Sequence, residues 1–163
     1  MKKILLVMAA LFCVATVSAQ QKWSIGAHVG TGLKADAEWF YSGDKYVEGR
    51  FGMGWGYHGS GICADFVALH NWNLCNWNWT PSVGKWYLDA GCGVNLGGRA
   101  NYVFLGAAGT VKFGIKFNKV PIRLAIDYTP VVGPDIVYVK GASWAGFYGA
   151  GLYNCGLSAT WCF

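Results

Sequence analysis

The stretch from residue 111 to residue 130, VKFGIKFNKVPIRLAIDYTP, decides the fold. Its two arms alternate apolar side chains with polar or small ones, and a short polar turn at residues 118–121 separates them. Alternation with period 2 on both sides of a turn predicts a β-hairpin. Each arm has roughly ten residues, the length that a tilted strand needs to cross a bilayer. One face of the hairpin is apolar and the other carries charges of both signs, which is typical of a strand whose apolar side faces lipid.

The composition extends this interpretation to the rest of the chain. The 163 residues are 54% hydrophobic and 17% aromatic, and 24 of them are glycine. A water-soluble protein of this size would have difficulty hiding so much apolar surface. After residue 19 no segment has 18 continuous apolar residues, so the sequence predicts no transmembrane helix. The net charge of +5 is too small to indicate a nucleic-acid partner.

The N-terminus predicts export. Lys2 and Lys3 form a positive region, residues 4–14 form an apolar region, and residues 17–19 resemble an A-x-A cleavage site. We therefore expect residues 1–19 to be a cleaved signal peptide and residues 20–163 to form one domain. Five cysteines remain after cleavage, without the Cys/His spacing of a zinc site, so we expect no metal and no cofactor. A disulfide between two of them stays open.

The alternation predicts an all-β fold, an eight-stranded antiparallel up-and-down transmembrane β-barrel. Residues 73–82, 96–103, 118–121 and 130–149 are expected to be turns or loops. In the orientation usual for membrane barrels, 96–103 and 130–149 face the outside and 118–121 faces the periplasm. The expected strands lie near residues 23–31, 33–41, 46–57, 62–71, 84–95, 111–117, 122–130 and 152–163.

The distribution of charge supports the assignment of apolar side chains to the outer face of each strand and polar ones to the inner face. No outward position carries a charge, and a lipid-facing Lys or Arg at mid-bilayer would cost roughly 2–4 kcal/mol. Eight strands enclose an interior that side chains just fill, and buried charges must be paired. We therefore expect a plugged lumen with a salt-bridge network of six acids and six bases. Its members are Lys34, Asp36, Glu38, Glu48, Arg50, Asp65, Lys85, Asp89, Lys112, Lys116, Arg123 and Asp127.

Three segments carry a resemblance to a known family. The chain ends in Trp161-Cys162-Phe163, and residues 86–93 and 121–130 contain WYLDAGCG and PIRLAIDYTP. With these, the chain resembles the small bacterial outer-membrane β-barrel family, of the OmpX/OmpA-barrel kind. The resemblance implies eight antiparallel strands, residence in the bacterial outer membrane, and roles from envelope integrity to adhesion. It also implies two partners, outer-membrane lipid and the barrel-insertion machinery that reads the C-terminal strand.

Other motifs indicate no catalytic chemistry. Residues 54–59 spell G-x-G-x-x-G, but a dinucleotide site needs a following helix, and here a further strand is expected. His58 and Ser60 are neighbours in an outer turn, without the sequence signal of a nucleophile and its base. The tryptophans of residues 71–79 fit a membrane interface better than a stacking platform. We therefore expect no enzyme.

The functional expectation is a structural or surface-interaction barrel. Exposed loops on a rigid scaffold usually carry recognition, so Trp144, Phe147 and Tyr148 of the loop 131–149 are the candidate contacts with an unknown surface ligand. Two alternatives stay open: a narrow passive pore for small solutes, which would need an open lumen, and a lipid-modifying outer-membrane enzyme.

Overall fold

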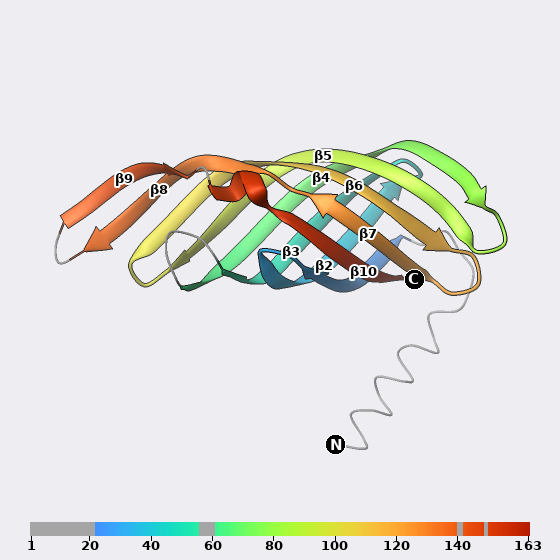
Figure 1. The fold of residues 1–163 in the computed structure, drawn as a ribbon, viewed down its shortest axis with the longest axis horizontal. Helices are drawn as coiled ribbons and strands as arrows, with labels where there is room; N and C mark the ends of the chain where they lie inside the picture. The colour runs from blue at the N-terminus through green and yellow to red at the C-terminus, as the bar shows by residue number, and fades with distance from the viewer. Residues whose placement is uncertain (1–21, 56–60, 140–141, 149) are drawn as a thin grey trace, which may run out of the picture.

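The computed structural model describes residues 22–55, 61–139, 142–148 and 150–163, and these residues form a single antiparallel β-sheet with one short 3-10 helix (Figure 1). No helix in these ranges is long and apolar enough to cross a membrane. The elements are β1 (Trp23–Val29), β2 (Gly32–Ser42), β3 (Lys45–Trp55), β4 (Ile62–Thr80), β5 (Gly84–Arg99), β6 (Tyr102–Phe117), β7 (Ile122–Tyr128), β8 (Val131–Val139), β9 (Ala142–Tyr148), the 3-10 helix η1 (Ala150–Tyr153) and β10 (Cys155–Cys162).

The sheet closes on itself. Each strand from β1 to β6 pairs with the next in sequence, and β10 pairs with both β7 and β1. Ile25 lies opposite Trp161 at the seam between the first and last strands. The predicted fold class, an all-β eight-stranded antiparallel barrel, is confirmed.

β7 and β8 act as one long strand along β6. The register between Lys116 and Arg123 continues without a shift to Tyr102 and Val137. The interruption lies at Pro130, which has no N–H to donate but whose carbonyl accepts a hydrogen bond from the Gly109 amide at 3.0 Å. Nine of the ten labelled strands therefore form the eight strands of the barrel wall, called staves: β1 to β6, β10, and β7 together with β8. The tenth, β9, pairs with β8 alone among the described residues.

Three predicted connections are wrong because they are strands. β4 continues through residues 73–80, so the turn to β5 is only residues 81–83. Residues 96–99 and 102–103 extend β5 and β6 up to a two-residue turn, and residues 131–139 and 142–148 form the β8–β9 hairpin. The staves from β4 to β8 are consequently longer than β1, β2, β3 and β10.

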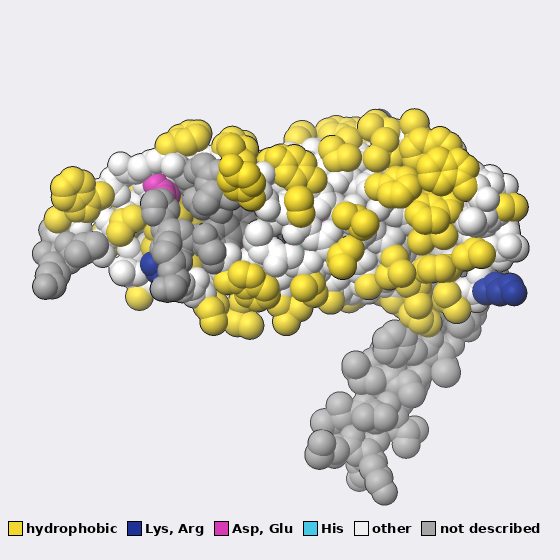
Figure 2. Space-filling view, viewed as in Figure 1, with side chains coloured by type: hydrophobic (Ala, Val, Ile, Leu, Met, Phe, Trp, Pro, Cys, Tyr) yellow, Lys and Arg dark blue, Asp and Glu magenta, His cyan; other side chains and the backbone are white. Residues whose placement is uncertain are grey.

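The outward face of the barrel is apolar. Exposed large side chains alternate with buried ones along each stave, as with Leu33 in β2, Phe51 in β3 and Ile126 in β7. Among the described strand residues the outward positions carry no charge except Lys45, the first residue of β3. Figure 2 shows the hydrophobic side chains spread along the visible side, with charged groups mainly near its two ends.

The two ends of the barrel differ, and they are named here for what they hold. The hairpin end carries the β8–β9 hairpin, at the left of Figure 1. The terminal end carries the start of β1, the end of β10 and the turns after β2, β4 and β6. An outward band of ring contacts near the terminal end includes the Trp23–Trp39 pair, with centroids 5.9 Å apart, and Phe113 stacked on Trp86 at 5.4 Å.

Candidate functional site

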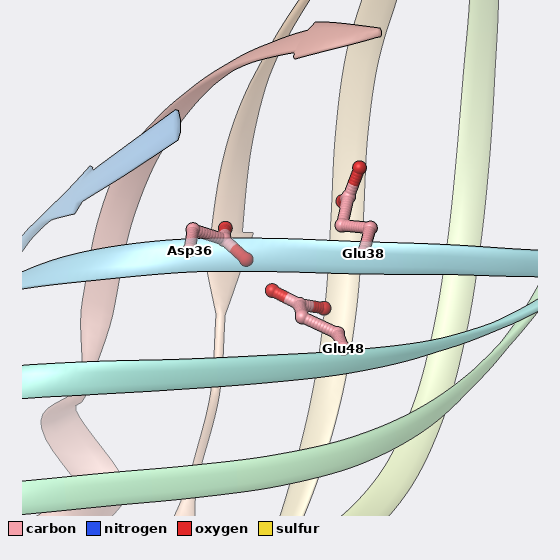
Figure 3. Close-up of side chains that lie close together, drawn as sticks. All are labelled: Asp36, Glu38 and Glu48. Carbon is pink, nitrogen blue, oxygen red and sulfur yellow. The ribbon is translucent and has the colours of Figure 1, made fainter. Parts of the chain in front are cut away.

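The lumen of the barrel holds most of the charge. Of the twelve residues predicted to form its salt-bridge network, ten are buried: Lys34, Asp36, Glu38, Glu48, Arg50, Asp65, Asp89, Lys112, Arg123 and Asp127. They occupy alternate positions of β2 to β7, whose alternation turns every second side chain inward. The close-up in Figure 3 shows Asp36 and Glu38 rising from one strand beside Glu48 from the next.

The centre of the network is built on Glu38 and Glu48. The Glu48 carboxylate accepts from Arg50 Nε at 2.5 Å and from Lys112 Nζ at 2.7 Å. The Glu38 carboxylate pairs with Lys112 at 3.2 Å and with Arg123 Nη1 at 2.9 Å. Lys112 thus bridges two carboxylates that lie opposite each other in the β2–β3 register, and their mutual repulsion is offset by the shared cation.

Two branches extend the network towards the two ends. Arg50 Nη2 reaches Asp127 at 3.2 Å, and His28 Nε2 lies 3.1 Å from the same carboxylate. Arg123 Nη2 reaches Asp89 at 3.0 Å, and the Asp89 carboxylate also accepts from the Tyr46 hydroxyl at 2.8 Å. Each carboxylate is therefore held by a cation and by at least one further donor, as burial demands.

Lys34 and Asp65 form a separate pair nearer the hairpin end. Their Nζ and Oδ2 atoms lie 2.6 Å apart, and the Asn95 amide donates to Asp65 at 2.6 Å. Both residues are almost fully buried. The neutral amide of Asn95 therefore supplies the buried Asp65 carboxylate with a second hydrogen-bond donor, beside the Lys34 ammonium group.

Asp36 is the least satisfied member. Its two carboxylate oxygens accept no hydrogen bond from the described residues, and Arg50 Nε lies 3.8 Å away. One oxygen each of Asp36, Glu38 and Glu48 lies within 4.8 Å of the others (Figure 3), a spacing compatible with a cation. The set does not fit a metal well, however, because Glu38 and Glu48 already bind Arg50, Lys112 and Arg123.

Between the charge network and the hairpin end, apolar side chains fill the lumen. Phe104 and Tyr102 of β6 are each 1% exposed and their rings lie 5.8 Å apart. They pack with Val67 and Leu69 of β4 and with Val131 of β8. The charge network and this cluster, called here the apolar plug, together fill the lumen with side chains.

Two predicted network members lie elsewhere. Lys85 and Lys116 face each other across β5 and β6 at the terminal end, where both are exposed to solvent. Both lysines occupy inward positions of their strands, as expected. At the terminal end, however, β5 and β6 extend beyond the shorter strands, so the two side chains lie outside the part of the lumen that is filled with side chains. The six-to-six balance of the sequence therefore does not hold in the buried interior of the described chain, where the six predicted acids and Asp135 meet four Lys or Arg side chains.

The candidate contact residues lie in a strand rather than in a loop. Trp144 and Phe147 of β9 are 69% and 73% exposed. Tyr148 ends β9, and its side chain lies outside the described part of the structure. His58, Ser60 and most of the G-x-G-x-x-G stretch also fall outside the described residues.

Sequence reasoning missed the neutral partners of the charges. Asn71, Asn95, Tyr46, Ser24 and Thr129 all hydrogen-bond to network carboxylates. Ser24, Tyr46, Asn71 and Asn95 lie at inward positions of their strands, and Thr129 follows β7 at the same alternation, so the period-2 count that found the charges could have found them. Phe104 lies between the predicted loop 96–103 and the predicted strand 111–117, in a stretch with no predicted strand, and had no such signal.

The fold and the lumen define a class: a closed eight-stranded antiparallel β-barrel whose interior is filled by a charge network and an apolar plug. No family model, no curated protein and no solved structure matches the chain. Among the described residues, the five cysteines from Cys63 to Cys162 are not joined by a disulfide.

Proposed function

We propose that this chain is an integral outer-membrane β-barrel protein with a structural or surface-interaction role and a plugged polar lumen. The observation that carries the proposal is the inverted distribution of polarity. Charged side chains such as Arg50 and Lys112 are about 1% exposed, while Phe51 and Ile126 on the outer face are more than 60% exposed. A barrel in water would hide the second set and expose the first.

The filled lumen favours a non-conducting role over a pore. Eight staves leave an interior that side chains just fill, and here the network and the apolar plug occupy it. The proposal therefore places the activity on the surface of the barrel.

The β8–β9 hairpin is the proposed contact surface. Residues 142–148 contain no charged side chain and expose Trp144 and Phe147. Within the described residues β9 pairs only with β8, so its other edge presents backbone groups that an extended segment of a partner protein could pair with. The occupant we propose is such a segment, from a protein at the cell surface.

Membrane insertion is tested by flotation. The chain, refolded in the presence of phosphatidylcholine vesicles, is expected to float with them through a density gradient and to stay with them after washing at high pH. Recovery at the bottom of the gradient in soluble, folded form would contradict the proposal.

Orientation is tested with an epitope tag inserted after residue 140, at the hairpin, or after residue 119, in the turn after β6. Antibody labelling of intact cells is expected for the first variant only. Labelling of the second variant alone would place the hairpin on the wrong side for a surface contact.

A further inference from the structure

A cavity of about 570 Å³ opens at the terminal end of the barrel, below the charge network. Its volume is within the range of roughly 300–1,000 Å³ that is usual for small-molecule sites. The residues that line it come from Lys22 before β1, from β2 and the turn after it, from β3 to β7, and from the end of β10.

The cavity carries a surplus of positive charge. Three lysines, Lys22, Lys85 and Lys116, line it together with Asp44. The other two charged groups, Arg123 and Asp89, neutralise each other at 3.0 Å. With that pair set aside, three positive charges meet one negative charge.

Lys85 and Lys116 are the unusual pair. They lie directly opposite each other in the β5–β6 register, and like charges in this position destabilise a sheet. Of the described carboxylates none lies within 4.0 Å of either ammonium group. The nearest candidate on the same strand, Asp89, already accepts from Arg123, Tyr46 and Asn73. An anion between the two lysines would remove their repulsion.

The inner wall of the cavity is aromatic and held in place. The Arg123 guanidinium lies 4.9 Å from the ring centroid of Phe40 and 4.4 Å from that of Tyr87. Its hydrogen bonds to Glu38 and Asp89 fix it there. Flat rings that line the same cavity as the paired lysines suit a ligand that has an apolar ring as well as an anionic group, and the volume is larger than a free phosphate ion needs.

We infer that this cavity binds a small organic anion, a phosphate or carboxylate carried on an apolar ring, with Lys85 and Lys116 holding the anionic group. The inference needs only the folded barrel and does not depend on where the barrel resides. In the orientation proposed above, the cavity would open to the periplasm.

The test is calorimetric titration of the full barrel in non-ionic detergent micelles with 4-nitrophenyl phosphate. Wild-type protein is expected to bind one equivalent. Lys85→Gln and Lys116→Gln should each weaken binding roughly threefold to tenfold, the effect of one screened charge at close range. Lys119→Gln is the matched control, because Lys119 is an exposed lysine of the neighbouring turn that does not line the cavity.

Two further ligands separate the contributions. Neutral 4-nitrophenol should bind much more weakly if the anionic group is recognised, and inorganic phosphate should bind more weakly if the ring is recognised. A heat-dependent shift in gel mobility shows that each variant is folded before titration. The inference is overturned if folded wild-type protein gives no binding, if Lys119→Gln weakens binding as much as the cavity variants, or if 4-nitrophenol binds as well as its phosphate.

Discussion

At the scale of single residues, the buried carboxylates of the lumen differ in how many hydrogen-bond and ion-pair partners they have. Glu48 accepts hydrogen bonds or ion pairs from Arg50, Lys112 and Asn71. Asp36 lies beside it, and within the described part of the chain its carboxylate accepts no hydrogen bond and has Arg50 Nε at 3.8 Å as its ion-pair contact. Both side chains are fully buried, so the difference between them lies in their partners and not in their solvation.

Glu48→Gln is expected to lower the free energy of unfolding by roughly 3–5 kcal/mol, because it leaves Arg50 and Lys112 buried without their common partner. The measurement is denaturant unfolding in detergent micelles, followed by tryptophan fluorescence. Asp36→Asn is the control of matched size. It removes a charge near Glu38 and Glu48 that has little to offset it, so stability should be unchanged or higher. A loss for Asp36→Asn as large as that for Glu48→Gln would contradict this account of the network.

Inward glycines permit close contact between staves. A Cβ atom at the inward Gly93 in β5 would overlap the carbonyl oxygen of Ala68 on β4, whereas a Cβ atom at the outward Gly49 in β3 would meet nothing within 4 Å. Gly93→Ala should therefore cost about 1–3 kcal/mol of stability, and Gly49→Ala should change it by less than about 0.5 kcal/mol. Thermal or denaturant unfolding of the two variants gives the comparison. Equal effects would mean that the sheet adjusts freely at residue 93.

At the scale of elements, the strands with regular alternation could be predicted from sequence and their extensions could not. The period-2 pattern gave the existence, order and inward face of all eight staves, because one side of each is uniformly apolar. Gly97 and Gly98 resemble a turn in the sequence, yet Gly97 is an inward strand residue whose missing side chain leaves room for the ring of Phe104. The role of such a glycine depends on a residue in another strand.

The candidate site was predictable only in part, for a related reason. Alternation identified the charged side chains that face inward. How deeply each of them is buried, however, depends on how far its strand extends beyond the neighbouring strands. Lys85 and Lys116 have the inward phase and still lie outside the filled lumen. Which acid pairs with which base depends on how the strands are placed around the barrel. The alternation within a single strand does not determine that placement.

The hairpin divides into a part that the barrel needs and a part that it does not. Residues 131–137 of β8 pair with β6, and Val131 packs into the apolar plug. Replacing residues 138–143 by Asn-Gly, which suits a two-residue hairpin turn, removes the last two β8–β9 pairs. It keeps a backbone amide at position 138, where that of Tyr138 donates to the Asn101 carbonyl at 2.9 Å, and should leave unfolding unchanged. Replacing all of residues 131–149 by a short linker should lower stability, because it uncovers Phe104 and Tyr102. Equal stability of the two variants would show that β8 does not contribute to the barrel.

At the scale of the whole molecule, the arrangement runs from the terminal end to the hairpin end as cavity, charge network and apolar plug. Such an interior should not conduct ions. Reconstituted in a planar bilayer with an open porin as positive control, the protein is expected to give no stable conductance steps. Reproducible steps of one size would mean that the lumen opens, and would favour the pore alternative.

The central claim is that the barrel is closed and that its apolar outer face lies in the outer membrane. The most direct test is the electrophoretic mobility of the protein in outer-membrane fractions, with unboiled samples compared with boiled ones. A closed barrel has no free edge among its eight staves and resists detergent until it is heated, so the account predicts two mobilities that convert to one on boiling. A protein found in the soluble periplasmic fraction with a single mobility would contradict it.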